Sequence, residues 1–139
     1  MSRVAIVTGG TRGIGAATST ALKDKVCDVA ATYGSDDEKA KAFSEETGIK
    51  VFKWDVSDFE ACISGVARVE SDLGPVDILV NNAGITRDGT VHKMTYENWQ
   101  AVINTNLGSC FNMSRAVIEG MRERKFGRIV NVGSINGQA

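Results

Sequence analysis

The sequence has no excess of charge of either sign, no long hydrophobic run and only one histidine. Its 139 residues carry 16 basic and 17 acidic side chains, so nothing favours nucleic acid or an anionic membrane as a partner. No apolar run approaches the ~20 residues of a membrane span, and the N-terminus lacks the apolar core of a signal peptide. We therefore expect a cytoplasmic protein without a membrane segment. Because His92 is the only histidine, a Ser-His-Asp triad has one candidate base and no supporting motif.

Cysteine is also scarce, and internal repeats, low-complexity segments and linkers are absent. The three cysteines, Cys27, Cys62 and Cys110, are widely spaced and set among apolar residues. An odd number in this context favours buried free thiols over a disulfide or a metal site. The length and the 42% of hydrophobic residues suit a single domain with one core, which we assign to residues 1–139.

The sequence does contain a regular alternation of predicted strands and helices. Apolar runs predict strands at residues 4–7, 29–32, 49–54, 76–80 and 129–132. Helical periodicity and capping residues predict helices at residues 14–24, 36–47, 58–73 and 96–124. Such alternation builds βαβ units, whose right-handed crossovers give a parallel sheet. We expect an α/β, doubly wound Rossmann sheet with the strand order 3-2-1-4-5, by analogy with dinucleotide-binding folds.

A glycine-rich turn joins the first predicted strand to the first predicted helix. Gly9 permits a tight turn, Gly13 lets the backbone approach a pyrophosphate, and Gly15 lets the helix lie close on the strand. Free N–H groups at the helix start and the positive end of the helix dipole favour phosphate. The candidate ligand contacts of this loop are Gly9, Gly10, Thr11, Arg12, Gly13, Ile14 and Gly15. The alternative is a tight strand–helix turn that binds no ligand.

A second polar cluster follows the fourth predicted strand, at Asn81-Asn82-Ala83-Gly84. The small residues let the backbone pass close to a flat ligand, while the two amides can tie adjacent strand ends together. The candidate ligand contacts of this cluster are Asn82, Ala83, Gly84 and Ile85. Because open α/β sheets bind ligands at the carboxyl ends of their strands, we expect this cluster to share one site with the glycine loop.

Two further segments carry polar residues that could take part in catalysis. Asn104 and Asn106 lie within an apolar helical stretch, where asparagine competes for backbone hydrogen bonds, so we expect a local distortion of that helix. The alternative for Asn106 is a satisfied buried amide. Ser134 follows the fifth predicted strand, where its hydroxyl can donate to a substrate carbonyl.

The spacing T-G-x-x-x-G-I-G over residues 8–15 and the run Asn-Asn-Ala-Gly-Ile-Thr-Arg-Asp over residues 81–88 resemble the short-chain dehydrogenases/reductases. The resemblance covers essentially the whole chain. It implies that Asn106 interrupts its helix and anchors a water of the proton relay, and that Ser134 polarises a ketone. It also implies that Asp55 and Val56 meet the adenine ring of a dinucleotide, although Asp55 could instead cap a turn.

The end of the second predicted strand bears on the choice of nicotinamide cofactor. An acidic residue at this point would bind the ribose 2′-hydroxyl of NAD. Tyr33 occupies the place instead, a Gly-Ser turn follows it, and Arg12 could pair with a 2′-phosphate. These residues favour NADP(H) over NAD(H), although Asp36 and Asp37 would repel a phosphate if they pointed inward.

Two stretches, residues 81–99 and 127–138, resemble reductases of 3-oxoacyl thioesters, and the acetoacetyl-CoA reductases most of all. They imply NADPH-dependent reduction of acetoacetyl-CoA to 3-hydroxybutyryl-CoA. Reduction of a 3-oxoacyl-acyl-carrier protein is the alternative. In either case Asp88 would line the substrate mouth, unless it is ordinary loop surface. The resemblance also implies a homotetramer for a full-length form.

The resemblance further implies a catalytic Tyr-x-x-x-Lys motif, which would lie beyond Ala139, together with the C-terminal strands and the lid. Neither Tyr33 nor Tyr96 has a lysine four residues later. We therefore expect this chain alone to be inactive, whether it is the ordered part of a longer polypeptide, a truncated form or one piece of a split enzyme. The alternative from another functional class is a non-catalytic module that binds or senses NADP(H).

Overall fold

A sheet of five parallel strands forms the centre of the molecule, in a computed structural model that describes residues 2–25, 27–85 and 89–133. The strands are β1 Arg3–Val7, β2 Cys27–Tyr33, β3 Lys50–Lys53, β4 Ile78–Asn81 and β5 Arg128–Asn131. Neighbouring strands pair in parallel, in the order β3-β2-β1-β4-β5. The predicted fold class, strand direction and strand order are confirmed.

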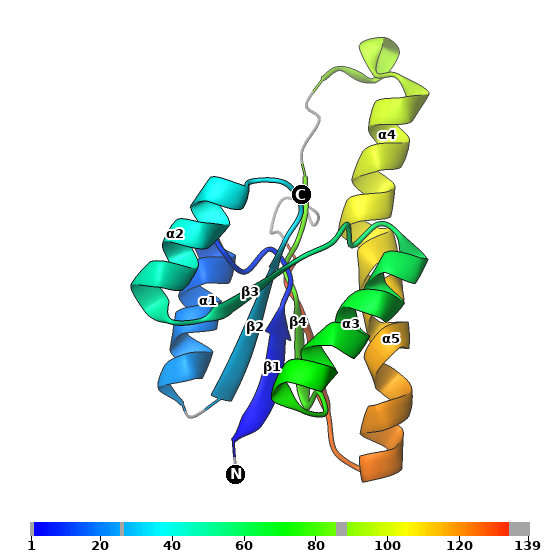
Figure 1. Cartoon of the computed structure of the whole chain (residues 1–139). Helices are drawn as coiled ribbons and strands as arrows, with labels where there is room; N and C mark the ends of the chain where they lie inside the picture. The colour runs from blue at the N-terminus through cyan, green and yellow to red at the C-terminus, as the bar shows by residue number, and fades with distance from the viewer. Residues whose placement is uncertain (1, 26, 86–88, 134–139) are drawn as a thin grey trace.

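Helices cover both faces of this sheet (Figure 1). They are α1 Gly13–Asp24, α2 Asp37–Thr47, α3 Phe59–Leu73, α4 Tyr96–Ile103 and α5 Ser109–Arg124. One apolar core lies between the sheet and the α3–α5 side, where Ile6 and Leu79 meet Met113. The other lies on the α1–α2 side, where Phe43 packs against Val7 and Val80. Since β1 is covered on both faces, its inner residues are all apolar and buried.

Side-chain caps fix where two of the helices begin. Asp36 accepts a hydrogen bond from the backbone N–H of Lys39 at 3.0 Å, and Asp58 accepts one from Ala61 at 3.1 Å. α2 ends at Gly48, which adopts the left-handed conformation with φ of 75°. These starts and stops agree with the capping residues seen in the sequence.

The apolar stretch over residues 96–124 is not one continuous helix. α4 and α5 are separated by a π-helical turn, η2 Asn104–Gly108, and a 3₁₀ turn, η1 Val91–Lys93, precedes α4. The predicted helical stretch and its predicted distortion at the two asparagines are both confirmed. α4 extends beyond the carboxyl edge of the sheet (Figure 1), so the π-turn lies at the level where the strands end.

Two smaller expectations are corrected. β4 begins at Ile78 rather than at Val76, because the N–H of Val76 donates to the Glu70 carboxylate at 3.1 Å and not to a neighbouring strand. All three cysteines are free, but only Cys62 is buried, while Cys27 and Cys110 are half-buried.

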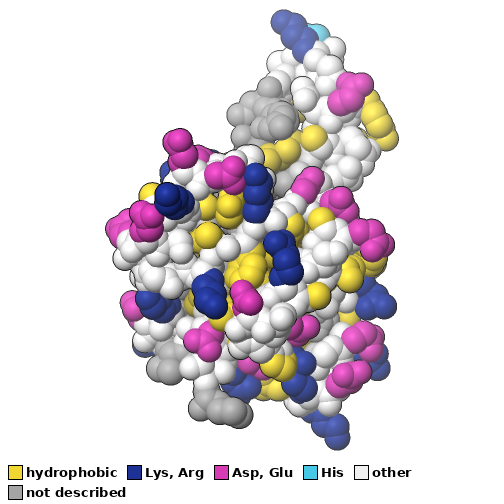
Figure 2. All heavy atoms as spheres, viewed as in Figure 1, with side chains coloured by type: hydrophobic (Ala, Val, Ile, Leu, Met, Phe, Trp, Pro, Cys, Tyr) yellow, Lys and Arg dark blue, Asp and Glu magenta, His cyan; other side chains and the backbone are white. Residues whose placement is uncertain are grey.

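The surface viewed in Figure 2 carries acidic and basic side chains side by side, in keeping with the balanced net charge of the chain. Within the ranges that the structure describes, no helix is both long and apolar enough to cross a bilayer.

Candidate functional site

A cleft of about 960 Å³ lies at the carboxyl ends of β1, β2 and β4. It brings together most of the residues that the sequence indicated. The predicted ligand contacts that line it are Gly9, Thr11, Arg12, Gly13, Ile14, Tyr33, Asp55, Val56, Asn82, Ala83, Gly84 and Ile85. Gly10 and Gly15 are buried behind this lining. Parts of the chain more than 70 residues apart therefore form one concave site, at the sheet edge where α/β folds bind ligands.

The glycine loop presents bare backbone to the cleft. Gly13 has φ of 55°, and a methyl group added there would meet no atom of the described residues within 4 Å. Arg12, at the N-cap position of α1, makes no capping hydrogen bond within the part of the chain that the structure describes. The first N–H groups of a helix lack intrahelical partners, so this end of α1 can accept a phosphate.

The packing partner of Gly15 differs from the predicted one. A side chain at Gly15 would overlap the carbonyl oxygen of Gly9 and crowd the amide of Asn82 at 2.7 Å. The helix start therefore lies close on the glycine loop itself, rather than on the strand. Ser19 of α1 reinforces this packing, since its hydroxyl donates to the Gly10 carbonyl at 3.0 Å.

Thr8 links the glycine loop to the turn after β4. Its hydroxyl oxygen accepts hydrogen bonds from the backbone N–H groups of Asn82 and Ala83, both at 3.0 Å. Thr8 is 1% exposed, so water does not compete for these bonds. Sequence reasoning did not assign Thr8 this role, because it depends on a contact across 74 residues.

Asn81 at the end of β4 and Asn82 after it tie neighbouring segments together, as expected. The amide of Asn81 donates to the side chain of Asn131 on β5 at 3.0 Å. The amide of Asn82 donates to the carbonyl of Gly9 at 3.3 Å. The carboxyl ends of β1, β4 and β5 are thus held at fixed spacing around the cleft.

At the end of β2, the phenol of Tyr33 lies beside Asp37. Burial and then the hydrogen bond and charge of Asp37 raise the pKa of Tyr33 above its usual value. Asp37 also pairs with Lys53 across 3.1 Å. The hydrogen bond from Lys53, followed by that from Tyr33, lowers the pKa of Asp37. Asp37 is not part of the cleft lining, and its carboxylate is committed to Lys53 and Tyr33.

Two cations and two carboxylates do line the cleft: Arg12, Lys39, Asp36 and Asp55. Sequence reasoning missed Lys39, although the available signal was its place in the first turn of α2, three residues after the cap Asp36. The N–H of Gly10 donates to the carbonyl of Thr32 at 3.0 Å, so the loop that carries Arg12 lies against the end of β2. This end of the cleft can therefore offer positive charge to an anionic group.

Asp55 follows β3 and does cap a turn. One of its carboxylate oxygens accepts hydrogen bonds from the N–H and the hydroxyl of Ser57, at 2.9 and 2.7 Å. The other oxygen has no hydrogen-bond partner among the residues that the structure describes. The turn-capping alternative is therefore confirmed, and it leaves the second oxygen free for the predicted contact with a base.

Asn106 lies beside the cleft rather than in its lining, where Asn104 and Thr105 of the π-turn stand instead. Its side-chain amide pairs with the backbone of Ile85 in both directions. The π-turn is thereby attached to the segment that follows β4. The predicted residues Ser134 and Asp88 lie outside the described residues.

A family model described as short chain dehydrogenase matches residues 3–139 of the sequence. The chain belongs to the short-chain dehydrogenase family. The glycine loop, the asparagines at the end of β4 and the strand order of this short-chain dehydrogenase agree with that membership.

Individual relatives narrow the comparison. Acetoacetyl-CoA reductases from Shinella zoogloeoides and Rhizobium meliloti (strain 1021) are 64% and 65% identical over 138 residues, which are 99% of this chain and 57% of each relative. A 3-oxoacyl-acyl-carrier-protein reductase from Haemophilus influenzae is 40% identical over 137 residues, 97% of this chain and 56% of that protein. This short-chain dehydrogenase chain thus spans a little over half the length of the curated relatives that it matches.

Proposed function

We propose that the polypeptide containing this chain reduces acetoacetyl-CoA to 3-hydroxybutyryl-CoA with NADPH. The relatives at 64% and 65% identity that bear the name acetoacetyl-CoA reductase support this substrate. Reduction of a 3-oxoacyl-acyl-carrier protein is the second candidate, supported by the relative at 40% identity. Both substrates present the same 3-oxoacyl thioester to the site, so the chemistry at the carbonyl is common to them.

The cofactor proposal depends on one observation: Arg12 and Lys39 line the same cleft as the open backbone at Gly13. The backbone at Gly13 and the start of α1 suit the pyrophosphate of a dinucleotide. Arg12 and Lys39 would hold a 2′-phosphate, which NADP has and NAD lacks. Asp36 also lines the cleft, but one of its oxygens already accepts from the N–H of Lys39.

The remaining residues would hold the other parts of the cofactor and the substrate. Asp55 and Val56 would take the adenine, while Asn82, Ala83 and Gly84, held through Thr8, would support the nicotinamide side. Bound NADPH would supply hydride to the carbonyl carbon. Ser134 would orient the carbonyl oxygen by donating a hydrogen bond. Asn106 would keep the π-turn in place for a relay water.

The substrate proposal is tested with the full-length polypeptide, acetoacetyl-CoA and acetoacetyl-acyl-carrier protein, in parallel assays with NADPH and NADH. We expect NADPH oxidation with acetoacetyl-CoA and a lower kcat/KM with the carrier-protein substrate. A higher kcat/KM with the carrier protein would instead support the second candidate. Binding of NADPH without oxidation in the presence of either thioester would favour a sensor.

The cofactor preference is tested by direct binding to the purified chain. Arg12→Ala and Lys39→Ala should each weaken NADPH binding about 10- to 100-fold, the usual effect of losing one charged hydrogen bond, with little change for NADH. Lys41→Ala removes an exposed lysine of α2 that does not line the cleft, and should leave both affinities unchanged. Equal losses for NADPH and NADH in the two cleft variants would contradict recognition of a 2′-phosphate.

A further inference from the structure

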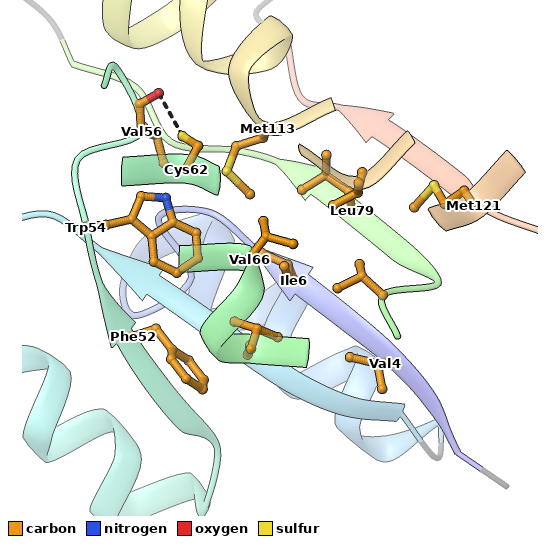
Figure 3. Close-up of a cluster of buried hydrophobic side chains, with 14 residues drawn as sticks. Val4, Ile6, Phe52, Trp54, Val56, Cys62, Val66, Leu79, Met113 and Met121 are labelled. Carbon is orange, nitrogen blue, oxygen red and sulfur yellow. Dashed lines mark hydrogen bonds between the residues drawn. The ribbon is translucent and has the colours of Figure 1, made fainter. Parts of the chain in front are cut away.

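The backbone carbonyl of Val56 is held by donors from two different helices. It accepts a hydrogen bond from the side-chain amide of Asn112 on α5 at 3.0 Å. It also accepts one from the thiol of Cys62 on α3 at 3.4 Å, drawn in Figure 3. Val56 itself is 7% exposed and lies directly after Asp55 in the cleft lining. The Val56 carbonyl in the cleft wall is therefore held by two hydrogen bonds from the protein interior.

Of the two donors, Asn112 is the stronger. A thiol is a weak hydrogen-bond donor, whereas an amide N–H is a full one. Burial also raises the pKa of the Cys62 thiol to about 11, against an opposing effect of the Trp54 indole N–H. Figure 3 shows the indole nitrogen on the edge of the Trp54 ring that points toward Cys62 and Val56. The thiol thus stays protonated and adds a second, weaker attachment to the same carbonyl.

Asn112 stands out among its neighbours on α5. It is 9% exposed, and Met113, Val117 and Met121 on the same helix belong to the apolar core. Burying an amide among such residues is costly unless its hydrogen bonds are made. Its hydrogen bond to Val56 spans 56 residues and reaches the wall of the cleft.

The neighbouring Asp55 is held through its side chain. Ser57 fixes one oxygen of its carboxylate through two hydrogen bonds, at 2.9 and 2.7 Å. The free oxygen can face the cleft only while the Asp55–Val56 backbone keeps its orientation. Two contacts fix that orientation: the N–H of Asp58 donates to the Asp55 carbonyl at 3.1 Å, and Asn112 holds the Val56 carbonyl at 3.0 Å.

We propose that Asn112 is a positioning residue that fixes the Asp55 carboxylate, and that it thereby sets the selectivity of the cleft for a purine base that bears an amino group. This inference rests on the proposed function. An amino group at the purine 6-position donates to a carboxylate, whereas a 6-oxo group presents an acceptor and is repelled. Such a mismatch discriminates strongly only when the carboxylate cannot turn away.

The test compares the binding of NADP⁺ and its hypoxanthine analogue, nicotinamide hypoxanthine dinucleotide phosphate, to the purified chain by calorimetric titration. The unaltered chain should bind the adenine form at least about 10-fold more tightly, the value of one good hydrogen bond to a charged group. In Asn112→Leu this ratio should fall below about threefold, mainly through loss of affinity for the adenine form.

Val117→Ala is the matched control. It removes buried methyl groups from the same helix but keeps both hydrogen-bond donors to the Val56 carbonyl, so it should lower Tm and leave the base ratio unchanged. If Asn112→Leu does not fold, Asn112→Ala removes the amide without adding bulk. It has no donor for the Val56 carbonyl, so it should also lose the base ratio.

The outcomes separate the two proposals. Failure of the unaltered chain to bind either dinucleotide would overturn the proposed function and this inference with it. Binding with a base preference that Asn112→Leu or Asn112→Ala retains would overturn only the inference, and would leave Asn112 as a satisfied core amide. Loss of the preference in Val117→Ala as well would also overturn it, because general destabilisation would then explain the result.

Discussion

Asn106 and the backbone of Ile85 form a closed two-bond pair. The Oδ1 of Asn106 accepts from the N–H of Ile85 at 2.7 Å, and its Nδ2 donates to the carbonyl of Ile85 at 2.9 Å. The π-turn that carries Asn106 and the segment after β4 that carries Ile85 are therefore held together by one side chain. The irregular turn in the helix is thus matched to a specific backbone partner 21 residues earlier.

Asn106→Ala should release the Ile85 amide. We expect faster hydrogen exchange at the Ile85 N–H, and a loss of about 1 kcal/mol in the free energy of unfolding, because the bonds lie in an exposed part of the molecule. Exchange measured by NMR on the purified chain checks this. Asn104→Ala, which removes a side chain of the same turn that bonds to Gln100, should leave Ile85 protected. Unchanged exchange at Ile85 in Asn106→Ala would contradict the pairing.

Gly13 and Gly48 form a matched pair for testing the glycine loop. Both have positive φ, 55° and 75°, so replacing either by alanine should cost about 1–2 kcal/mol of stability. Only the Gly13→Ala methyl group would enter the cleft, and we expect it to weaken NADPH binding at least about 10-fold, that is by at least ~1.4 kcal/mol. Gly48→Ala should be equally destabilised and bind normally. Similar affinities in the two variants would refute phosphate binding at Gly13.

Gly65 and Gly108 should respond to alanine with opposite signs. A methyl group at Gly65 of α3 would overlap the ring of Trp54, whereas one at Gly108 would meet nothing closer than 3.8 Å. We expect Gly65→Ala to lose about 1–3 kcal/mol from overpacking, despite the better helix propensity of alanine. Gly108→Ala should gain about 0.5–1 kcal/mol. Denaturant unfolding of both variants checks the signs, and a stabilised Gly65→Ala would contradict the close packing of α3 on Trp54.

The Asp37 cluster predicts a pH-dependent contribution to stability. A carboxyl whose pKa is lowered in the fold stabilises the protein above its unfolded pKa, and this contribution is lost as the pH falls through the folded pKa. Asp37→Asn should therefore be less stable than the unaltered chain at neutral pH, and the difference should vanish in acid, below the ordinary Asp value of about 3.9. Unfolding curves across that range check the trend. A difference that persists unchanged in acid would rule out this electrostatic origin.

The same variant should change the titration of Tyr33. Because the hydrogen bond and charge of Asp37 contribute to the raised pKa of Tyr33, Asp37→Asn should move that pKa back toward its usual value. Ultraviolet absorbance of the phenolate measures the shift directly. An unchanged titration would leave burial as the sole cause.

Much of the fold could be predicted because its determinants are local. Asp36 and Asp58 precede the N–H groups that they cap by three residues, a spacing visible in the sequence. The two asparagines in an apolar helix likewise predicted the distortion now seen at η2, since their side chains compete for the backbone hydrogen bonds of a regular helix. The strand order needed the further analogy with dinucleotide-binding folds.

What escaped prediction depends on distances between remote segments. Asn112 lies on the buried side of α5 beside Met113. Helical periodicity is read from apolar residues alone, so it does not predict that an amide at this position is buried. Lys39 resembles any other charged residue of a solvated helix until the fold brings it beside the loop of Arg12. The place of Lys39 three residues after the cap Asp36 was a local signal, but nothing in the sequence around Asn112 indicated its contact with Val56.

The hydroxyl of Thr8 has a consequence for how the molecule is made. It joins β1 to a turn 74 residues further along, so neither partner can adopt its final shape until both have left the ribosome. A nascent chain that ends before Asn82 therefore has a glycine loop with no opposing wall. Ligand affinity should arise abruptly during synthesis, when the second of these segments joins the first, rather than grow with each strand added.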